Sequence, residues 1–253
     1  MSAPALPAGW RLDARARVGS TNEEAKKHAL AGAPEFTLVW ALEQTEGRGR
    51  RGRSWSSPPG NLYLSLILRP DIPPAEAAQI GFVAAIALAE ALRPLLPDTV
   101  ELALKWPNDV LVGRCKVSGI LPEALAAGEG GRIEALVLGI GVNVASHPEG
   151  TAWPATDLAA AGVTVGLEGL LERLAAALDR WILLWRQEGF RPVRERWMSL
   201  ALARGAPVEL RLDGRTLSGR FVEIDQEGAL VLAPGDGSPP QRIRAGEVFF
   251  PGL

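Results

Sequence analysis

Four arginines and three glycines alternate in residues 47–53, which read Gly-Arg-Gly-Arg-Arg-Gly-Arg, and a tryptophan follows at position 55. Guanidinium groups donate paired hydrogen bonds to the oxygens of phosphates and carboxylates, and glycines leave neighbouring backbone N–H groups accessible. Because glycine loses much backbone freedom on ordering and these arginines bury little surface, the segment is predicted to be a mobile loop. Taken alone, it is as compatible with a solvated linker or a nonspecific nucleic-acid patch as with an anion-binding site.

A second group of polar residues stands among apolar neighbours between positions 105 and 116. It comprises Lys105, Asn108, Asp109 and Lys116. Charged side chains enclosed by apolar surface need a partner of opposite charge or a ligand, so this group is a candidate site. A surface hairpin whose lysines extend into water is the alternative. The Trp-Pro dipeptide after Lys105 restricts the backbone more than a plain edge hairpin requires, which favours the site.

A third polar group, Ser20, Thr21 and Asn22, precedes helix-forming residues that continue to Gly32. Thr21 and Glu24 have the spacing of a capping box, which predicts the start of a helix. Capping alone accounts for these residues. The alternative is that polar side chains at an exposed helix start hydrogen-bond the ureido or amide group of a ligand.

The elements that position these groups are predicted from hydrophobic periodicity and from glycine and proline breaks. Apolar strands flank the arginine-rich loop, and further strands surround the polar hairpin. An alanine-rich helix and an amphipathic helix supply core surface, and short strands near the C-terminus predict a small β-barrel. The predicted strands are residues 36–42, 61–68, 100–104, 110–112, 116–121, 133–138, 208–212, 215–224 and 229–232, and the two long helices are residues 75–93 and 166–187.

Composition narrows the class of protein. The 253 residues are 47% hydrophobic with a formal net charge of −2, which predicts a globular protein and argues against nucleic acid as the main partner. Cys115 is the single cysteine, and His28 and His147 lie far apart, so neither an internal disulfide nor a histidine metal cluster is expected. The N-terminus lacks the features of an export signal, and no apolar run is expected to reach membrane-spanning length. We expect a cytoplasmic protein without a membrane partner.

Five motifs in this order resemble those of the biotin protein ligases, the biotin–[acetyl-CoA-carboxylase] ligases, over nearly the whole chain. Each motif alone is modest, but their common order, with a small β-barrel behind them, is specific. The motifs are Ser20-Thr21-Asn22; Gln44 with residues 47–53 and Trp55; residues 105–110; Lys116 with Gly119-Ile120-Leu121; and residues 139–143.

The resemblance implies an α+β fold. A biotin/lipoate ligase-like catalytic domain of helices packed on a mixed β-sheet is expected over residues 1–203, and a small Src-homology-3-like β-barrel over residues 204–253. Fewer than twenty residues precede Ser20, too few for the N-terminal helix-turn-helix of bifunctional members, so the enzyme-only class without DNA binding is expected. Pro122 departs from the family pattern. Because proline cannot donate a ladder hydrogen bond, a sheet edge or a bulge is predicted there.

The resemblance also implies a two-step ligation. The biotin carboxylate attacks the α-phosphorus of ATP to give biotinyl-5′-AMP and pyrophosphate, and a lysine of a biotin carboxyl carrier protein then displaces AMP. Both steps build negative charge, so catalysis is expected to rest on positioning and on cationic groups, with Mg²⁺ screening the pyrophosphate. ATP, Mg²⁺ and biotin are therefore the expected small molecules, and no metal site made of protein ligands is expected.

By the same resemblance, Lys116, Arg48 and Asp109 are the expected catalytic residues, with Lys116 between the biotin carboxylate and the α-phosphate. Trp55 is expected to pack against the adenylate, and Asn108 and Asp109 to orient the phosphates, the metal or the incoming amine. The expected biotin-binding residues are Ser20, Thr21, Asn22, Gln44, Gly47, Arg48, Arg50, Lys116 and Gly119, and the expected ATP-binding residues are Arg48, Arg50, Arg51, Arg53, Trp55, Lys105, Asn108 and Asn143.

Two other classes of protein would use the same residues. A lipoate-type ligase shares the fold and the adenylation chemistry, but the sequence lacks an Arg-Arg-x-Ser-Gly-Gly-Gly-like run. A nucleic-acid-binding module would use the arginines, but it needs more basic surface than a net charge of −2 offers. The sequence leaves open the identity of the carrier protein, the role of the barrel and whether the chain forms a homodimer.

Overall fold

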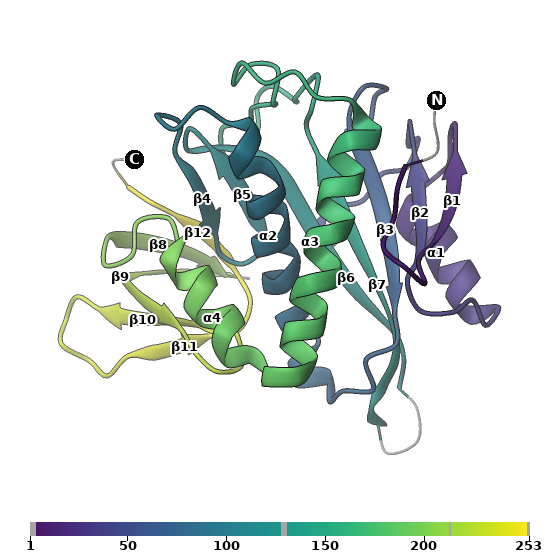
Figure 1. The fold of residues 1–253 in the computed structure, drawn as a ribbon. Helices are drawn as coiled ribbons and strands as arrows, with labels where there is room; N and C mark the ends of the chain where they lie inside the picture. Colours follow the sequence, from purple (N-terminus) through teal and green to yellow (C-terminus); the bar gives the residue numbers. More distant parts are fainter. Residues whose placement is uncertain (1–3, 128–130, 213, 252–253) are drawn as a thin grey trace.

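In a computed structural model, which describes residues 4–127, 131–212 and 214–251, a seven-stranded sheet forms the centre of the molecule (Figure 1). The strand order is β1-β2-β3-β7-β6-β5-β4. β1 runs parallel to β2 and the other neighbours are antiparallel, so the sheet is mixed, as predicted. The strands are β1 (Arg11–Arg15), β2 (Thr37–Ala41), β3 (Leu62–Leu68), β4 (Leu102–Lys105), β5 (Asp109–Val112), β6 (Cys115–Ala127) and β7 (Ile133–Val142).

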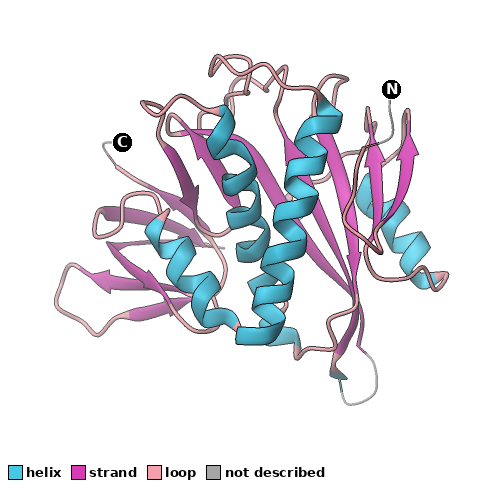
Figure 2. Ribbon diagram, viewed as in Figure 1, coloured by secondary structure: helices cyan, strands magenta, loops and turns pink. Residues whose placement is uncertain are grey.

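Helices cover both faces of this sheet (Figure 2). α1 (Thr21–Leu30) lies on one face, where Ala25 and Ala29 pack against apolar residues of β2, β3 and β7. α2 (Gln79–Leu92) and α3 (Leu167–Glu188) lie side by side on the other face, as Figure 1 shows. The main core therefore lies between the sheet and the pair α2 and α3, and α1 is left free to present its first turn to a site on the opposite face.

The segment around α2 is the most apolar part of the chain. The helix predicted over residues 75–93 consists of α2 with two short 3₁₀ turns, η2 (Pro74–Glu76) and η3 (Arg93–Leu95), at its ends. By length and composition alone, Pro74–Leu95 is apolar enough to cross a membrane, so the expectation that no apolar run reaches that length is wrong. Of its most apolar window, 72% is buried inside the protein, and packing between the sheet and α3 accounts for its composition.

Beyond α3, the chain forms α4 (Phe190–Ser199) and a five-stranded antiparallel sheet of order β11-β10-β9-β8-β12. α4 was not predicted, although its buried Phe190, Val193 and Trp197 have helical spacing. The three predicted strands are present, and the two further strands are only three residues long, too short to show a period. The strands are β8 (Pro207–Leu212), β9 (Arg215–Ile224), β10 (Leu230–Pro234), β11 (Gln241–Ile243) and β12 (Glu247–Phe249).

The C-terminal sheet is docked against the end of β4. Leu104 in β4 exchanges backbone hydrogen bonds with the segment 200–202, so the chain that leads into β8 extends the edge of the large sheet. Trp106, directly after β4, donates from Nε1 to the carbonyl oxygen of Gly228 at 3.1 Å. Gly228 has φ +81° and packs against the ring of Phe82 in α2. These contacts hold the C-terminal sheet beside the strand that carries Lys105.

Two local predictions near β6 are confirmed. Gly113 and Arg114, with φ of 56° and 66°, form the two-residue turn between β5 and β6. β5 pairs with β6 only as far as Gly119, so Pro122 lies where β6 has a neighbour on one side only. On the side without a neighbouring strand, no backbone hydrogen bond is lost because proline has no N–H. Pro122 therefore occupies the edge position predicted for it.

Candidate active site

A cavity of about 600 Å³ opens where the loop after β2, the start of α1 and the ends of several strands come together. The residues that the sequence analysis grouped by chemistry converge here from distant positions in the chain. Those lining the cavity are Ser20, Thr21, Asn22, Gln44, Arg48, Arg50, Arg53, Trp55, Lys105, Asn108, Asp109, Lys116, Gly119 and Asn143.

Two residues of the predicted site, Gly47 and Arg51, do not line the cavity. Gly47 is buried behind it, and a Cβ at this position would overlap the carbonyl oxygen of Trp55 and the hydroxyl of Ser57. Glycine at this position therefore allows the loop to pack closely on itself. Arg51 is exposed and adopts a left-handed backbone conformation with φ 57°. Its expected contact with ATP stays a prediction.

The charge centre of the cavity is one carboxylate between two ammonium groups. Asp109 begins β5 directly opposite Lys105, the last residue of β4. Lys105 Nζ lies 3.3 Å from Asp109 Oδ2, and Lys116 Nζ lies 2.6 Å from Asp109 Oδ1. The side chains of Lys105 and Asp109 are 6% and 9% exposed, whereas that of Lys116 is 26% exposed. Lys116 is thus the member of the centre that can reach a ligand.

Burial and charge act in opposite directions on these groups. Burial alone would raise the pKa of Asp109, but the charges of Lys116 and Lys105 and their hydrogen bonds outweigh it and hold that pKa below its usual range. Burial lowers the pKa of Lys105, opposed by the attraction of Asp109 and assisted by the repulsion of Lys116. Asp109 therefore stays ionised at neutral pH, and an anion bound beside the lysines would oppose the lowering of the Lys105 pKa.

The start of α1 is capped by a residue from elsewhere in the chain. Ser20 occupies the N-cap without a side-chain capping bond, so the capping box expected from Thr21 and Glu24 is wrong. Instead, Gln44 Oε1 accepts hydrogen bonds from the Thr21 backbone N at 2.8 Å and from Thr21 Oγ1 at 3.0 Å. Gln44 Nε2 donates to Ser57 Oγ at 2.9 Å, which defines the orientation of its carboxamide. The capping explanation of Ser20 is thereby weakened in favour of ligand contact.

Two arginines of the loop reach across to other elements. Arg50 begins the short 3₁₀ turn η1 (Arg50–Gly52) and donates from Nη1 to Asn108 Oδ1 at 3.3 Å. Arg53 Nη2 lies 2.6 Å from Glu247 Oε1 of β12. The loop is therefore tied both to the polar hairpin and to the C-terminal sheet.

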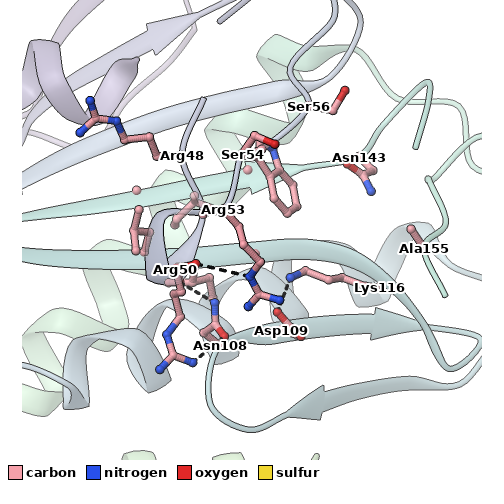
Figure 3. Close-up of a pocket in the computed structure, with 18 of the residues that line it drawn as sticks. Arg48, Arg50, Arg53, Ser54, Ser56, Asn108, Asp109, Lys116, Asn143 and Ala155 are labelled. Atoms are coloured by element: carbon pink, nitrogen blue, oxygen red, sulfur yellow. Dashed lines mark hydrogen bonds and ion pairs between the residues drawn. The ribbon is translucent and has the colours of Figure 1, made fainter. Parts of the chain in front are cut away.

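Arg48 is directed away from the charge centre. Figure 3 shows its guanidinium pointing away from Lys116 and Asp109. Arg48 Nη1 lies 2.8 Å from Glu23 Oε1 in the first turn of α1, and its side chain is 53% exposed. Because exposed ion pairs contribute little to stability, this pairing can be exchanged for a ligand anion at small cost. The mobility predicted for the loop stays a prediction.

Trp55 lies across two glycines of the sheet. A Cβ at Gly119 would lie 2.9 Å from Trp55 Cζ3, and a Cβ at Gly141 would lie 2.5 Å from Trp55 Nε1. Any larger residue at either position would therefore displace the ring. Lys116 Nζ is 5.3 Å from the ring centroid, within cation–π range. Trp55 Nε1 is buried and has no hydrogen-bond partner among the residues described.

Asn143 connects the cavity to the loop that follows β7. Its Nδ2 donates to the carbonyl oxygen of Thr156 at 3.0 Å. The backbone of Lys116 pairs with the same loop, accepting from Thr156 N at 2.9 Å and donating to Pro154 O at 2.7 Å. In this structure Asn143 supports the loop beside Lys116, and its expected contact with ATP stays a prediction.

Sequence reasoning missed part of the lining. Lys105 Nζ lies 4.7 Å from the ring centroid of Trp153 and 6.0 Å from that of Phe249. A tryptophan in a loop is only a weak signal of a binding site. No pattern in the sequence near Lys105 indicates that β12 lies beside it. The other lining residues not named as site residues are Gly49, Ser54, Ser56, Leu64, Pro107, Ile120, Leu121, Gly139, Ile140, Gly141, Pro148, Thr151, Ala152, Ala155 and Glu247.

Ser65 is a further polar residue that was missed, although it lies beneath the cavity rather than in its lining. It is fully buried in β3, with its Oγ 2.8 Å from Thr21 Oγ1 and 2.5 Å from Asn22 Oδ1. The signal was present, because Ser65 is a small polar residue at the centre of a strand whose seven residues are all buried.

Two family models match this chain. Residues 15–143 match the Biotin/lipoate A/B protein ligase family, and residues 205–250 match the Biotin protein ligase C terminal domain. The chain belongs to the biotin/lipoate A/B protein ligase family. The first matched segment contains every predicted residue that lines the cavity. The part of the chain that shows the family is therefore also the part that forms the site.

Individual members of the ligase family show the same relationship. The chain is 42% identical over 243 residues to the biotin–[acetyl-CoA-carboxylase] ligase of Paracoccus denitrificans, covering 94% of this chain and 99% of that protein. It is 35% identical to the bifunctional ligase/repressor of Bacillus subtilis, covering 87% of this chain and 68% of that protein. Its fold matches the biotin protein ligase from Aquifex aeolicus in complex with biotin and ATP, with a TM-score of 0.80, 28% identity and coverage of 94% and 97%.

These matches confirm the α+β fold class and the resemblance to biotin protein ligases. The boundary expected near residues 203 and 204 stays a prediction, as do the roles of individual site residues. The name of the family model includes lipoate ligases, whereas both curated relatives above carry ligase names and the matched structure contains biotin.

Proposed function

We propose that this ligase family member attaches biotin to a specific lysine of a biotin carboxyl carrier protein, using ATP and passing through biotinyl-5′-AMP. The observation that carries the proposal is one cavity that combines amide and hydroxyl groups, arginine forks and the Lys105–Asp109–Lys116 centre. The name of the Paracoccus relative and the biotin and ATP in the Aquifex structure support the same chemistry.

The start of α1 suits the head group of biotin. A ureido group has two N–H donors and one carbonyl acceptor, so it needs both kinds of partner. Ser20 and Thr21 contribute hydroxyls, and the Gln44 carboxamide is held in one orientation beside them. We assign these three residues to biotin binding. Desolvated hydrogen bonds of this kind discriminate strongly against ligands that lack the matching groups.

Lys116 is proposed to act in the first step. Its ammonium group donates to the biotin carboxylate and to an α-phosphate oxygen, and thereby brings two anions together. The carboxylate oxygen bonds to phosphorus as the bond to pyrophosphate breaks, and the charge that develops is stabilised by Lys116 and by Arg48, Arg50 and Arg53. Arg48 reaches the ligand by leaving Glu23, which is a weak surface pairing.

Mg²⁺ is proposed to enter with ATP as part of the substrate. Within residues 4–127, 131–212 and 214–251, no group of three or more histidine, cysteine, aspartate or glutamate side chains is placed to hold a metal ion. Asp109 is already engaged by two ammonium groups. The phosphate oxygens would therefore supply most of the ligands of Mg²⁺, which screens the leaving pyrophosphate. Asn108 and Asp109 remain assigned to orienting the phosphates, the metal or the incoming amine.

In the second step, the acceptor lysine attacks the carbonyl carbon of the adenylate as a neutral amine. The new amide bond forms as the bond to AMP breaks, AMP leaves with the bonding electron pair, and the amine releases a proton. Trp55 is proposed to pack against the adenylate, because its ring already lies over Gly119 and Gly141 in the cavity. Enclosure of the mixed anhydride keeps water from hydrolysing it before the acceptor arrives.

Pyrophosphate release from ATP, measured with biotin, with lipoate and without either acid, tests this function. We expect release only with biotin, and transfer of labelled biotin when a carrier domain with its acceptor lysine is added. A carrier domain whose lysine is replaced by arginine is the matched control. Release that depends on lipoate but not on biotin would reassign the substrate, and no release with either acid would overturn the proposal.

A further inference from the structure

A chain of polar and charged side chains runs from Asn22, in the lining of the cavity, to Glu123 and Lys26, which lie outside that lining. Asn22 Nδ2 donates to Glu123 Oε2 at 2.7 Å, and Lys26 Nζ lies 2.8 Å from Glu123 Oε1. Asn22 Oδ1 accepts from Ser65 Oγ at 2.5 Å. Asn22 is only 5% exposed, so its carboxamide makes these contacts largely shielded from water.

Two acceptors face the NH₂ group of Asn22: the Glu123 carboxylate at 2.7 Å and, more distantly, the carbonyl oxygen of Leu121 at 3.4 Å. An ionised carboxylate only accepts hydrogen bonds, so the NH₂ group of Asn22 must face Glu123 and the oxygen must face Ser65. The oxygen then also lies against Gly139, where a Cβ would overlap it. Asn22 and Gly139 both line the cavity, and the edge of the carboxamide at that point is an acceptor.

Lys26 is the second hydrogen-bond partner of Glu123. It is bonded to Glu23 at 3.0 Å as well as to Glu123. Burial lowers the pKa of Lys26, but its hydrogen bonds to Glu123 and Glu23 outweigh burial and raise it. Lys26 is therefore a charged donor to Glu123 Oε1, which leaves Glu123 Oε2 to accept from Asn22.

We propose that Glu123 is a positioning residue for biotin: it orients the Asn22 carboxamide so that an acceptor, not a donor, faces the ligand at the biotin end of the cavity. The inference rests on the proposed function, because the N–H groups of a ureido are the donors that such an acceptor matches. Glu123 lies outside the cavity lining and acts through Asn22.

Replacement of Glu123 by glutamine has a definite consequence. Lys26 still donates, so the introduced glutamine must turn its oxygen toward Lys26 and its NH₂ group toward Asn22. Asn22 then has to flip, and a donor replaces the acceptor that faces the cavity. We expect Glu123→Gln to weaken biotin binding about tenfold, roughly the effect of one lost hydrogen bond with an unmatched polar group. ATP affinity should change less than about twofold, since the flip is local to the biotin end.

A second substitution separates orientation from simple loss of structure. Lys26→Met alone leaves the Glu123 carboxylate as an acceptor, so biotin affinity should stay within about twofold of the wild type. Lys26→Met combined with Glu123→Gln removes the competing donor and lets the glutamine oxygen face Asn22. The double variant is therefore expected to bind biotin more tightly than Glu123→Gln, within about threefold of the wild type.

Biotin and ATP dissociation constants and melting temperatures for the wild type, the two single variants and the double variant form the test. Glu24→Gln, which breaks the exposed pair with Lys27 on the same helix, is the control for surface charge.

Additive losses in the double variant, or unchanged biotin affinity in Glu123→Gln, would overturn the inference. If the single variant does not fold, the double variant decides: affinity within about threefold supports orientation, and a tenfold loss excludes it. A wild type that binds no biotin refutes the proposed function instead, so the two failures are distinguishable.

Discussion

Single residues of the charge centre are stabilised only as a set. Asp109 lies between Lys105 and Lys116, and removing Asp109 leaves both ammonium groups without their counter-charge in surroundings of low polarity. With both lysines protonated, the set carries one surplus positive charge, which an anionic ligand can neutralise. Each of these residues therefore affects stability and ligand chemistry together, and a variant is informative only when both are measured.

Replacement of Lys116 by alanine tests the proposed role in catalysis. A charge aimed at the reacting phosphate acts mostly in the transition state, so adenylate formation should fall by about two to four decades while biotin affinity changes only modestly. Pyrophosphate release and isothermal titration measure the two quantities. Lys27→Ala, at an exposed lysine paired with Glu24, is the control. Near-normal turnover of Lys116→Ala would show that another group holds the two anions.

Replacement of Asp109 by asparagine tests the electrostatic account of stability. Removing a buried carboxylate strands Lys105, and the free energy of unfolding should fall by about 3 kcal/mol at pH 7. The folded-state pKa of Asp109 lies below its unfolded value, so its contribution is complete above about pH 4 and is lost as the pH falls through the folded-state pKa. Urea unfolding from pH 7 down to pH 3 should show the difference between the wild type and the variant beginning to narrow below about pH 4. A constant difference would contradict this assignment.

At the scale of elements, the arginine-rich loop is held by a few polar contacts rather than by a core. Its contacts include those of Arg50 with Asn108, Arg53 with Glu247 and Arg48 with Glu23. Trp55 supplies the apolar anchor at the end of the loop. Exposed polar contacts offset only part of an ordering cost of roughly 1 to 2 kcal/mol per residue, so bound anions should complete the ordering.

Hydrogen exchange over residues 46–58 tests ligand-dependent ordering of the loop. We expect slow exchange with biotin plus a nonhydrolysable ATP analogue, and faster exchange without ligands. Arg50→Gly removes one guanidinium fork and its bond to Asn108, so this variant should release biotinyl-5′-AMP faster into solution. Equal protection in both states would mean that the loop is preformed.

At the scale of the whole molecule, the C-terminal sheet is part of the cavity. β12 places Glu247 and Phe249 in its lining, and the turn after β9 receives the indole of Trp106, next to Lys105. Displacement of this sheet would therefore disturb the charge centre without any change in the residues that touch a ligand.

Gly228→Ala tests this coupling between the C-terminal sheet and the cavity. A Cβ there would lie 2.7 Å from Phe82 Cε2, in addition to the strain of φ +81°. Gly237 has the same φ and open space around it, so Gly237→Ala is a matched control. We expect losses of unfolding free energy of about 2 to 4 kcal/mol for Gly228→Ala and about 1 to 2 kcal/mol for Gly237→Ala. Only Gly228→Ala should lower kcat/KM for ATP, and equal effects of the two variants on kcat/KM would refute the coupling.

The sequence by itself determined which residues could meet an anion and which elements carry them. Alternation and apolar runs predicted β2 and β3 to within one residue at each end, because burial of a strand imposes a local pattern. They also predicted where β7 starts, but β7 continues through its glycines to Val142. The arginine-rich loop and the polar hairpin were recognised by residue type alone. Order along the chain then sufficed for the family resemblance, which needs no knowledge of distances.

Only the tertiary structure decided how these residues act on one another. It replaced the local capping of α1 with the Gln44 carboxamide, brought Glu123 beneath Asn22, and added Trp153 and Phe249 to the surroundings of Lys105. Such contacts join segments far apart in sequence, and their side-chain orientations depend on which donors and acceptors meet after packing. Periodicity and spacing record the burial of each element separately, so they contain no information on those pairings.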